Sequence, residues 1–118
     1  MIVLISPAKS LDMQAAYYPE ITLSEPSFLE ASSRLIEQLR LLNADEVQAL
    51  MGISEKLAAL NAQRFQDWHI DHKTESCAAI FAFQGDVYQG LDAASLNKKA
   101  LDFAQQHLRI LSGLYGIL

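Results

Sequence analysis

Three residues in the middle of the chain, Gly52, Ile53 and Ser54, separate two segments whose apolar residues recur at helical spacing. Gly52 suits the left-handed position that ends many helices, and Ser54 suits the N-cap of the helix that follows. The first backbone amides of a helix have no partner within it, so they favour a bound anion. Lys56 would add a positive charge at the same place. The spacing predicts a phosphate-binding corner between two helices.

The corner resembles the helix-hairpin-helix element that holds a DNA phosphate. That element reads apolar, X, Gly, apolar, Gly, X, Lys, X, Ala, and residues 50–58 match it at all but one position. Ser54 stands where a second glycine is usual, and the carboxylate of Glu55 would oppose an anion. Two interpretations therefore stay open, a contact with the backbone of double-stranded DNA and an ordinary helix corner. The expected DNA-binding residues are Gly52, Ile53, Ser54 and Lys56, with Arg64 as a distal contact.

Polar loops follow each of three predicted strands, and they offer a second site. Ligands of open α/β sheets bind at the carboxyl ends of strands, so the three loops could line one cleft. The alternative function is therefore an enzyme acting on a nucleotide or another phosphorylated small molecule, with Lys9 holding phosphate, Asp86 as general base and Tyr88 as proton donor or stacking group. Ordinary surface turns would also explain these loops. The candidate cleft residues are Ser6, Lys9, Asp12, Gly85, Asp86, Tyr88, Arg109 and Tyr115.

The residues that usually bind metals are too scattered to predict a metal site. His69 and His72 lie three apart in a predicted loop, and His107 is distant in sequence. The one cysteine, Cys77, lies in an apolar run and is expected to be a buried small hydrophobe. We expect no metal and no cofactor.

Two kinds of regular element must position these residues. Residues 2–5 and 77–83 are continuous apolar runs of strand length, and each predicts a strand buried on both faces. Residues 110–112 predict a third strand. Helices are predicted from about residue 28 to Leu42, capped by Ser24 or Ser27, then over residues 44–51, from residue 55 to about 68, and between residues 96 and 108. The second of these helices begins with a capping box, Asn43 to Glu46. The alternation predicts a mixed α/β fold with a small, partly parallel sheet and flanking helices.

Composition limits the class of protein. Of the 118 residues, 51% are hydrophobic and 19% are charged, which indicates one globular domain over residues 1–118. The net charge of −5 argues against broad nucleic-acid binding, so any DNA contact must be local. No apolar run reaches the ~20 residues that cross a bilayer, and the amino terminus lacks a secretory leader, so we expect a cytoplasmic protein without a membrane partner. The oligomeric state is not predicted.

Five segments in the same order resemble the YaaA family of bacterial peroxide-stress proteins. They are residues 4–12, 53–57, 83–91, 102–108 and 109–118. The resemblance covers nearly the whole chain. Family members continue beyond the glycine-tyrosine-glycine segment, so we expect this chain to be the N-terminal half of a longer protein.

The resemblance implies a function as well as a fold. It implies a cytosolic protein that helps bacteria survive hydrogen peroxide by limiting reactive free iron and the DNA damage that iron drives. It also implies a mixed α/β fold with a helix-hairpin-helix element that has affinity for DNA. No catalytic residue is carried over from the family.

Overall fold

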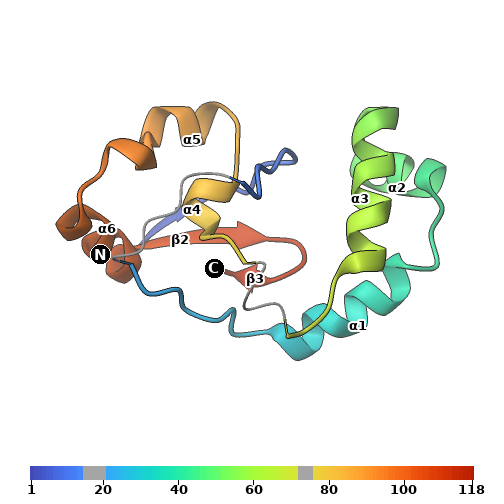
Figure 1. Cartoon of the computed structure of the whole chain (residues 1–118), viewed down its shortest axis with the longest axis horizontal. Coiled ribbons are helices and arrows are strands. Elements are labelled where there is room, and N and C mark those ends of the chain that lie inside the picture. The colour runs from blue at the N-terminus through green and yellow to red at the C-terminus, as the bar shows by residue number, and fades with distance from the viewer. Residues whose placement is uncertain (15–20, 72–75) are drawn as a thin grey trace. The chain divides into compact units, whose positions relative to one another are not determined.

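The computed structural model describes residues 1–14, 21–71 and 76–118, and it is a mixed α/β structure as predicted (Figure 1). The chain divides into two compact units. One unit combines Met1–Ser27 with Glu75–Leu118, and the other is Phe28–Thr74. Each unit is described here by itself. The expectation of a single domain over residues 1–118 stays a prediction.

The first unit is built on a small mixed sheet with the strand order β1-β2-β3. β1 (Val3–Ile5) pairs in parallel with β2 (Leu108–Ser112), and β2 pairs antiparallel with β3 (Gly116–Ile117). The parallel pair joins the two ends of the chain, since Leu4 lies beside Arg109. The prediction of a partly parallel sheet is confirmed, as are the first and third predicted strands.

The expectation that the first strand is buried on both faces is wrong. Val3 and Leu4 are both exposed, and only Ile5 is half-buried. β1 is an edge strand of three residues. Val3 and Leu4 point to opposite faces of the sheet, so neither face of β1 is fully covered. A continuous apolar run has the same appearance whether other elements cover it or not, so its sequence could not reveal this exposure.

The prediction of a second strand over residues 77–83 is also wrong. The segment instead forms the short helix α4 (Ala79–Ala82), which directs Phe81 and Ala82 into the core. A short apolar run does not distinguish a strand from a buried helical turn, and the three alanines at positions 78, 79 and 82 favour the helix. Phe81 forms the centre of the core together with Ala93 and Leu101.

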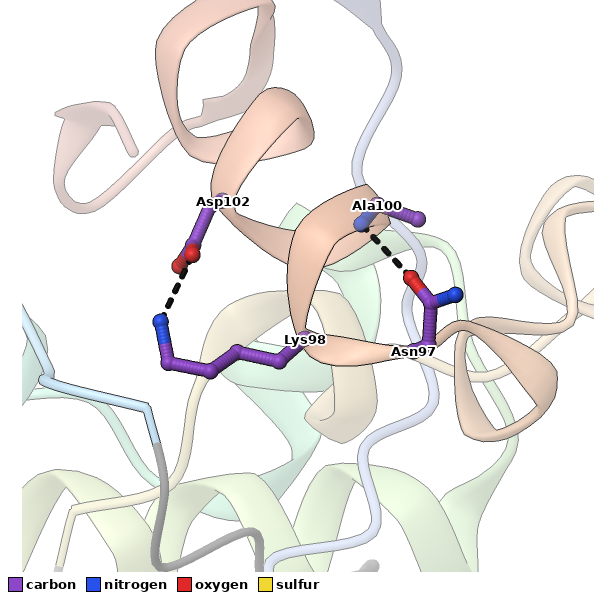
Figure 2. A network of polar contacts seen from close by, with 4 residues as sticks. All are labelled: Asn97, Lys98, Ala100 and Asp102. Carbon is purple, nitrogen blue, oxygen red and sulfur yellow. Dashed lines mark hydrogen bonds and ion pairs between the residues drawn. The ribbon is translucent and has the colours of Figure 1, made fainter.

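Three helical segments connect α4 to β2. They are α5 (Asp86–Leu91), the 3₁₀ turn η1 (Ala93–Ser95) and α6 (Lys98–His107). The Oδ1 atom of Asn97 accepts the backbone N–H of Ala100 at 2.9 Å, and Lys98 pairs with Asp102 at 2.6 Å along the first turns of α6 (Figure 2). The predicted helix between residues 96 and 108 is confirmed.

The second unit consists of three helices, α1 (Leu29–Leu39), α2 (Ala44–Met51) and α3 (Glu55–Asp67). All three were predicted, but the start and end of α1 differ from the prediction. Its N-cap is Phe28, whose side chain makes no capping bond, so neither Ser24 nor Ser27 caps it. Instead, the Ser32 hydroxyl donates to the Phe28 carbonyl oxygen at 3.0 Å. The helix ends at Leu39, three residues before the predicted end.

A reciprocal set of hydrogen bonds joins the end of α1 to the end of α3. The Nε atom of Arg40 donates to the Phe65 carbonyl oxygen at 2.8 Å, and its Nη2 atom donates to the Trp68 carbonyl oxygen. In return, the Gln66 side chain donates to the Arg40 carbonyl oxygen at 3.1 Å. A guanidinium group thus satisfies carbonyls that α3 cannot satisfy itself, and this fixes the two helix ends together within the unit.

Candidate functional site

The predicted capping box at the start of α2 is present. The Oδ1 atom of Asn43 accepts the Glu46 backbone N–H at 2.9 Å, and the Nδ2 atom of Asn43 donates to the Glu46 carboxylate at 3.0 Å. Glu46 therefore returns the bond to the side chain of the capping residue, whereas a standard capping box returns it to the backbone N–H. These two bonds fix where α2 begins.

The corner between α2 and α3 has the geometry that its glycine predicts. Gly52 adopts φ 61° and ψ 49°, the left-handed conformation that glycine reaches without strain. Its N–H donates to the Gln48 carbonyl oxygen at 2.9 Å, which closes the last turn of α2. Ile53, which follows Gly52 in the sequence, is half-buried, and α3 begins at Glu55.

Ser54 fills the place of the second glycine without any backbone strain. Its φ of −67° and ψ of 157° are extended values open to every L-residue. The Ser54 hydroxyl accepts the Leu57 backbone N–H at 3.2 Å, so Ser54 is the predicted N-cap of α3. The departure from the helix-hairpin-helix pattern is therefore compatible with the fold of the corner.

The first amides of α3 are only partly satisfied by the protein. Leu57 donates its backbone N–H to the Ser54 hydroxyl, and Ala58 donates to the Ser54 carbonyl oxygen at 2.9 Å. Among the residues that the structure describes, no acceptor takes the backbone N–H of Glu55 or Lys56. Both residues are exposed. Two of the four amides at this helix start are thus available to an anion from outside.

The side-chain charges around the corner are of both signs. Lys56 supplies an exposed cation, and Glu55 supplies an exposed carboxylate in the same first turn. Arg64 lies eight residues further along α3, ~12 Å away along the helix axis. It is half-buried, with its Nη1 atom out of contact with solvent. Any contact from Arg64 would therefore be peripheral to the corner.

In the first unit, the segment after β1 lies against the segment around Phe83. Leu11 forms an antiparallel bridge with Phe83. Asp12 donates its N–H to the Ala82 carbonyl oxygen at 2.7 Å, and Gln84 donates to the Ser10 carbonyl oxygen at 3.0 Å. The structure thus brings together two of the three predicted loops. The second one, however, follows a helix and not a strand, because the predicted strand over residues 77–83 is α4.

Tyr88 contacts both of these adjoining segments. Its side chain is buried, its ring stacks on Phe83 with the centroids 5.4 Å apart, and its hydroxyl donates to the Ser6 carbonyl oxygen at 2.5 Å. Burial raises the pKa of the Tyr88 phenol above its usual value. These contacts favour a structural role over the predicted role of proton donor or stacking group for a ligand.

The other cleft candidates fall into two groups. Lys9 and Asp86 are both exposed, and Gly85, at φ 126°, passes near Ala8, since a Cβ at Gly85 would lie 3.9 Å from the Ala8 Cβ. The Asp12 carboxylate accepts the Gln14 backbone N–H at 2.9 Å. These four residues belong to the two segments that lie together.

Arg109 lies on β2, and Tyr115 lies in the turn that follows it. The Nη1 atom of Arg109 donates to the carbonyl oxygens of Gln105 and Leu108, each at 2.7 Å. These carbonyls lie at the amino end of β2, so the guanidinium extends away from the loop that follows β1. Tyr115 lies in the turn between β2 and β3, where its N–H donates to the Ser112 hydroxyl at 3.0 Å. The structure does not place the Arg109 guanidinium with the two adjoining segments.

The sequence analysis missed a second helix N-terminus that has both a capping side chain and lysines in its first turn. Asn97 caps α6, and Lys98 and Lys99 follow it directly. The signal was present as a capping residue followed by two lysines. Lys98 is paired with Asp102, which leaves Lys99 as the matched counterpart of Lys56 for experiments.

Cys77 is half-buried, and its pKa is raised, first by burial and second by the negative charge of Asp12. Within residues 1–14, 21–71 and 76–118, no three His, Cys, Asp or Glu side chains gather as a metal ligand set. His72 lies outside the described residues. None of the described helices combines the length and the apolar character that crossing a membrane requires.

Comparison with known proteins adds one finding. The model of a protein family described as peroxide stress protein YaaA matches residues 1–118, which is the whole chain. The match agrees with the resemblance of the five sequence segments.

Proposed function

Because the chain belongs to the family of the peroxide stress protein YaaA, we propose that it protects DNA during peroxide stress by holding the phosphate backbone at the corner between α2 and α3. The observation that carries the proposal is that the backbone N–H groups of Glu55 and Lys56, two exposed residues, have no acceptor among the described residues, at the helix start where Lys56 also supplies an ammonium group. Amides at a helix N-terminus and a lysine recognise a phosphate without reading bases. Double-stranded DNA is therefore the proposed partner, and the cytoplasm is the proposed location.

The charge balance predicts weak binding. With a net charge of −5 and Glu55 beside the site, only a few phosphates can be neutralised. Non-specific binding of this kind has dissociation constants of roughly 10⁻⁴–10⁻⁶ M and weakens steeply as salt rises. Debye screening limits the repulsion by distant acidic residues to about 8–10 Å at cellular salt.

The test is a fluorescence anisotropy titration of two duplexes of unrelated sequence at several salt concentrations. Wild type should bind both duplexes equally. Lys56→Glu should weaken binding about tenfold and reduce the salt slope by about one. Glu55→Gln should strengthen binding, because it removes the opposing carboxylate while leaving the backbone amides in place.

Lys99→Glu is the matched control, since Lys99 is an exposed lysine in the first turn of a capped helix. It makes the same change in net charge as Lys56→Glu and should change the affinity less than twofold. If Lys56→Glu titrates like wild type, or if both reversals weaken binding equally, the corner is not the site.

The resemblance also implies an effect on reactive iron in the cell. In this proposal that effect does not require iron to bind to the chain. Strains carrying wild type or Lys56→Glu should then contain the same level of reactive iron after peroxide exposure, measured by electron paramagnetic resonance of chelated iron. DNA strand breaks should differ between the two strains. Equal strand breaks would contradict protection through DNA binding.

One observation favours a second candidate function, an enzyme acting on a phosphorylated small molecule. The segments that contain Lys9 and Asp86 are held together by the bonds of Ser10, Asp12 and Tyr88 to the facing chain. Lys9 would hold the phosphate and Asp86 would act as general base. Titration of a nucleoside monophosphate should shift the NMR signals of residues 8–10 and 85–86 in wild type but not in Lys9→Met. Signals that stay unchanged in wild type would remove this candidate.

A further inference from the structure

The turn that follows β2, residues 113–115, leaves the sheet at the same edge as the segment that follows β1. The two strands are parallel, and Ile5, the last residue of β1, lies beside Ile110. Parallel strands end at one edge of their sheet, so Ser6 and Ser112 both lie at that edge (Figure 1). Ligands of open α/β sheets bind at this edge.

The start of α5 lies near the same edge. The Tyr88 hydroxyl donates to the Ser6 carbonyl oxygen, and a Cβ at Gly85 would lie 3.9 Å from the Ala8 Cβ. Asp86, the first residue of α5, is therefore close to the segment that follows β1. The turn after β2 is thus a third segment at the place where the second candidate function puts a phosphorylated molecule.

Two glycines border this turn, and the described fold requires only one of them. Gly116 has φ 77°, a left-handed value that suits the end of a three-residue hairpin turn and favours glycine. Gly113 lies outside the left-handed region, and a Cβ added to it would meet no atom of the described residues within 4 Å. Glycine is also used where a ligand approaches the backbone closely, and this reason remains for Gly113.

The turn offers two hydrogen-bond donors. Within residues 1–14, 21–71 and 76–118, no acceptor takes the backbone N–H of Gly113. The Ser112 hydroxyl oxygen accepts the Tyr115 N–H at 3.0 Å, and the hydroxyl proton can still be donated to a ligand. An ammonium group is present in the segment after β1, on the exposed Lys9. Phosphate oxygens accept hydrogen bonds from all three kinds of donor.

We propose that the turn after β2 binds the phosphate group of a small molecule, with the Gly113 N–H and the Ser112 hydroxyl donating to phosphate oxygens and Lys9 supplying the opposite charge. A Cβ at position 113 would occupy the space through which the phosphate reaches the N–H. The inference rests on the second candidate function, and it names the group of the substrate that the site recognises.

The test is an NMR titration of the chain with adenosine monophosphate, and with adenosine as the counterpart that lacks phosphate. In wild type the nucleotide should shift the N–H signals of Gly113 and of residues 8–10, whereas adenosine should leave the Gly113 signal unchanged. Gly113→Ala should weaken binding of the nucleotide at least about tenfold, as expected for the loss of one hydrogen bond to a charged group.

Gly90→Ala is the matched control. Gly90 is an exposed glycine of the same unit, also outside the left-handed region and also with open space at its Cβ among the described residues. It lies toward the end of α5, four residues after Asp86. Gly90→Ala should bind the nucleotide like wild type. Neither alanine variant should melt at a lower temperature than wild type, because alanine at an accessible φ restricts the unfolded chain.

Four results would overturn the proposal. A lower melting temperature for Gly113→Ala would mean that the fold itself requires this glycine. Binding that Gly113→Ala leaves unchanged, binding that Gly90→Ala weakens equally, or a Gly113 shift that adenosine also causes would each exclude the turn as the phosphate site. Lys9→Met separates the inference from the function beneath it. If Lys9→Met abolishes binding and Gly113→Ala does not, the second candidate function stands without the turn, whereas absence of any shift in wild type removes both.

Discussion

The hydroxyl of Tyr88 donates a hydrogen bond to the backbone carbonyl oxygen of Ser6, 82 positions earlier in the chain. The bond joins α5 to the segment that follows β1. The Tyr88 ring also stacks on the ring of Phe83. A buried hydroxyl that found no acceptor would cost free energy, so the bond and the burial of the ring depend on each other. Tyr88 therefore adds a side-chain link between the two candidate loops to the backbone bonds that join residues 10–12 to residues 82–84.

Tyr88→Phe should lower the free energy of unfolding of the chain by about 1 kcal/mol, the usual net value of one hydrogen bond, because the Ser6 carbonyl loses its donor. Urea titration followed by circular dichroism measures this change. Val87→Ala, at an exposed neighbour on α5, should cost less than half as much. Equal losses for the two variants would show that the hydroxyl contributes nothing specific.

Stability should fall as the pH rises above about 9. Burial raises the pKa of Tyr88 above 10.0 and that of Cys77 above 9.0. Above these values the unfolded chain releases the protons while the folded chain still holds them, so ionisation favours unfolding. Urea titrations between about pH 7 and 11 check the sign. The decline should be shallower in the double variant Tyr88→Phe, Cys77→Ala, and an identical decline would contradict the assignment.

The Cys77 thiol should react slowly with iodoacetamide at neutral pH. Its raised pKa keeps it protonated, and the thiolate is the nucleophile. Intact-mass spectrometry of native protein should show much slower labelling than of urea-unfolded protein. Asp12→Asn should accelerate labelling of the native protein, because it removes the second cause of the raised pKa. Labelling as fast as in unfolded protein would contradict this view of Cys77.

Gly52→Ala should destabilise the chain by about 1–2 kcal/mol, because alanine is strained at φ 61°. Gly52→Asn should cost less, since asparagine adopts left-handed conformations more readily. Thermal melts measure both variants. The critical result is that Gly52→Ala is less stable than Gly52→Asn. The reverse order would mean that Gly52 does not adopt this conformation in solution.

Asn97→Ala should cost about 1 kcal/mol, because the Ala100 N–H loses the acceptor drawn in Figure 2. Asn97→Asp should retain wild-type stability, since aspartate also caps helices and favours the positive end of the helix dipole. Guanidinium denaturation compares the two variants. A loss in Asn97→Asp as large as in Asn97→Ala would contradict the capping role.

Local sequence signals determined the features that depend on neighbouring residues. The capping box at Asn43, the left-handed Gly52 and the cap at Ser54 were all predicted, because each involves contacts within four residues of the chain. The corner proposed to bind DNA is therefore encoded almost entirely by residues 43–58. The family was also recognisable from the sequence and is confirmed by the match over residues 1–118.

The tertiary structure alone decided the features that depend on what packs against a segment. An apolar run does not specify its covering layer, so the exposure of β1 and the helical form of residues 79–82 were both predicted wrongly. The partner of Tyr88 and the direction of the Arg109 side chain also follow from contacts with elements elsewhere in the fold. Hydrophobicity is non-directional, whereas a hydrogen bond needs a defined partner at a defined distance. That difference explains why local caps were predictable from the sequence and the exposure of β1 was not.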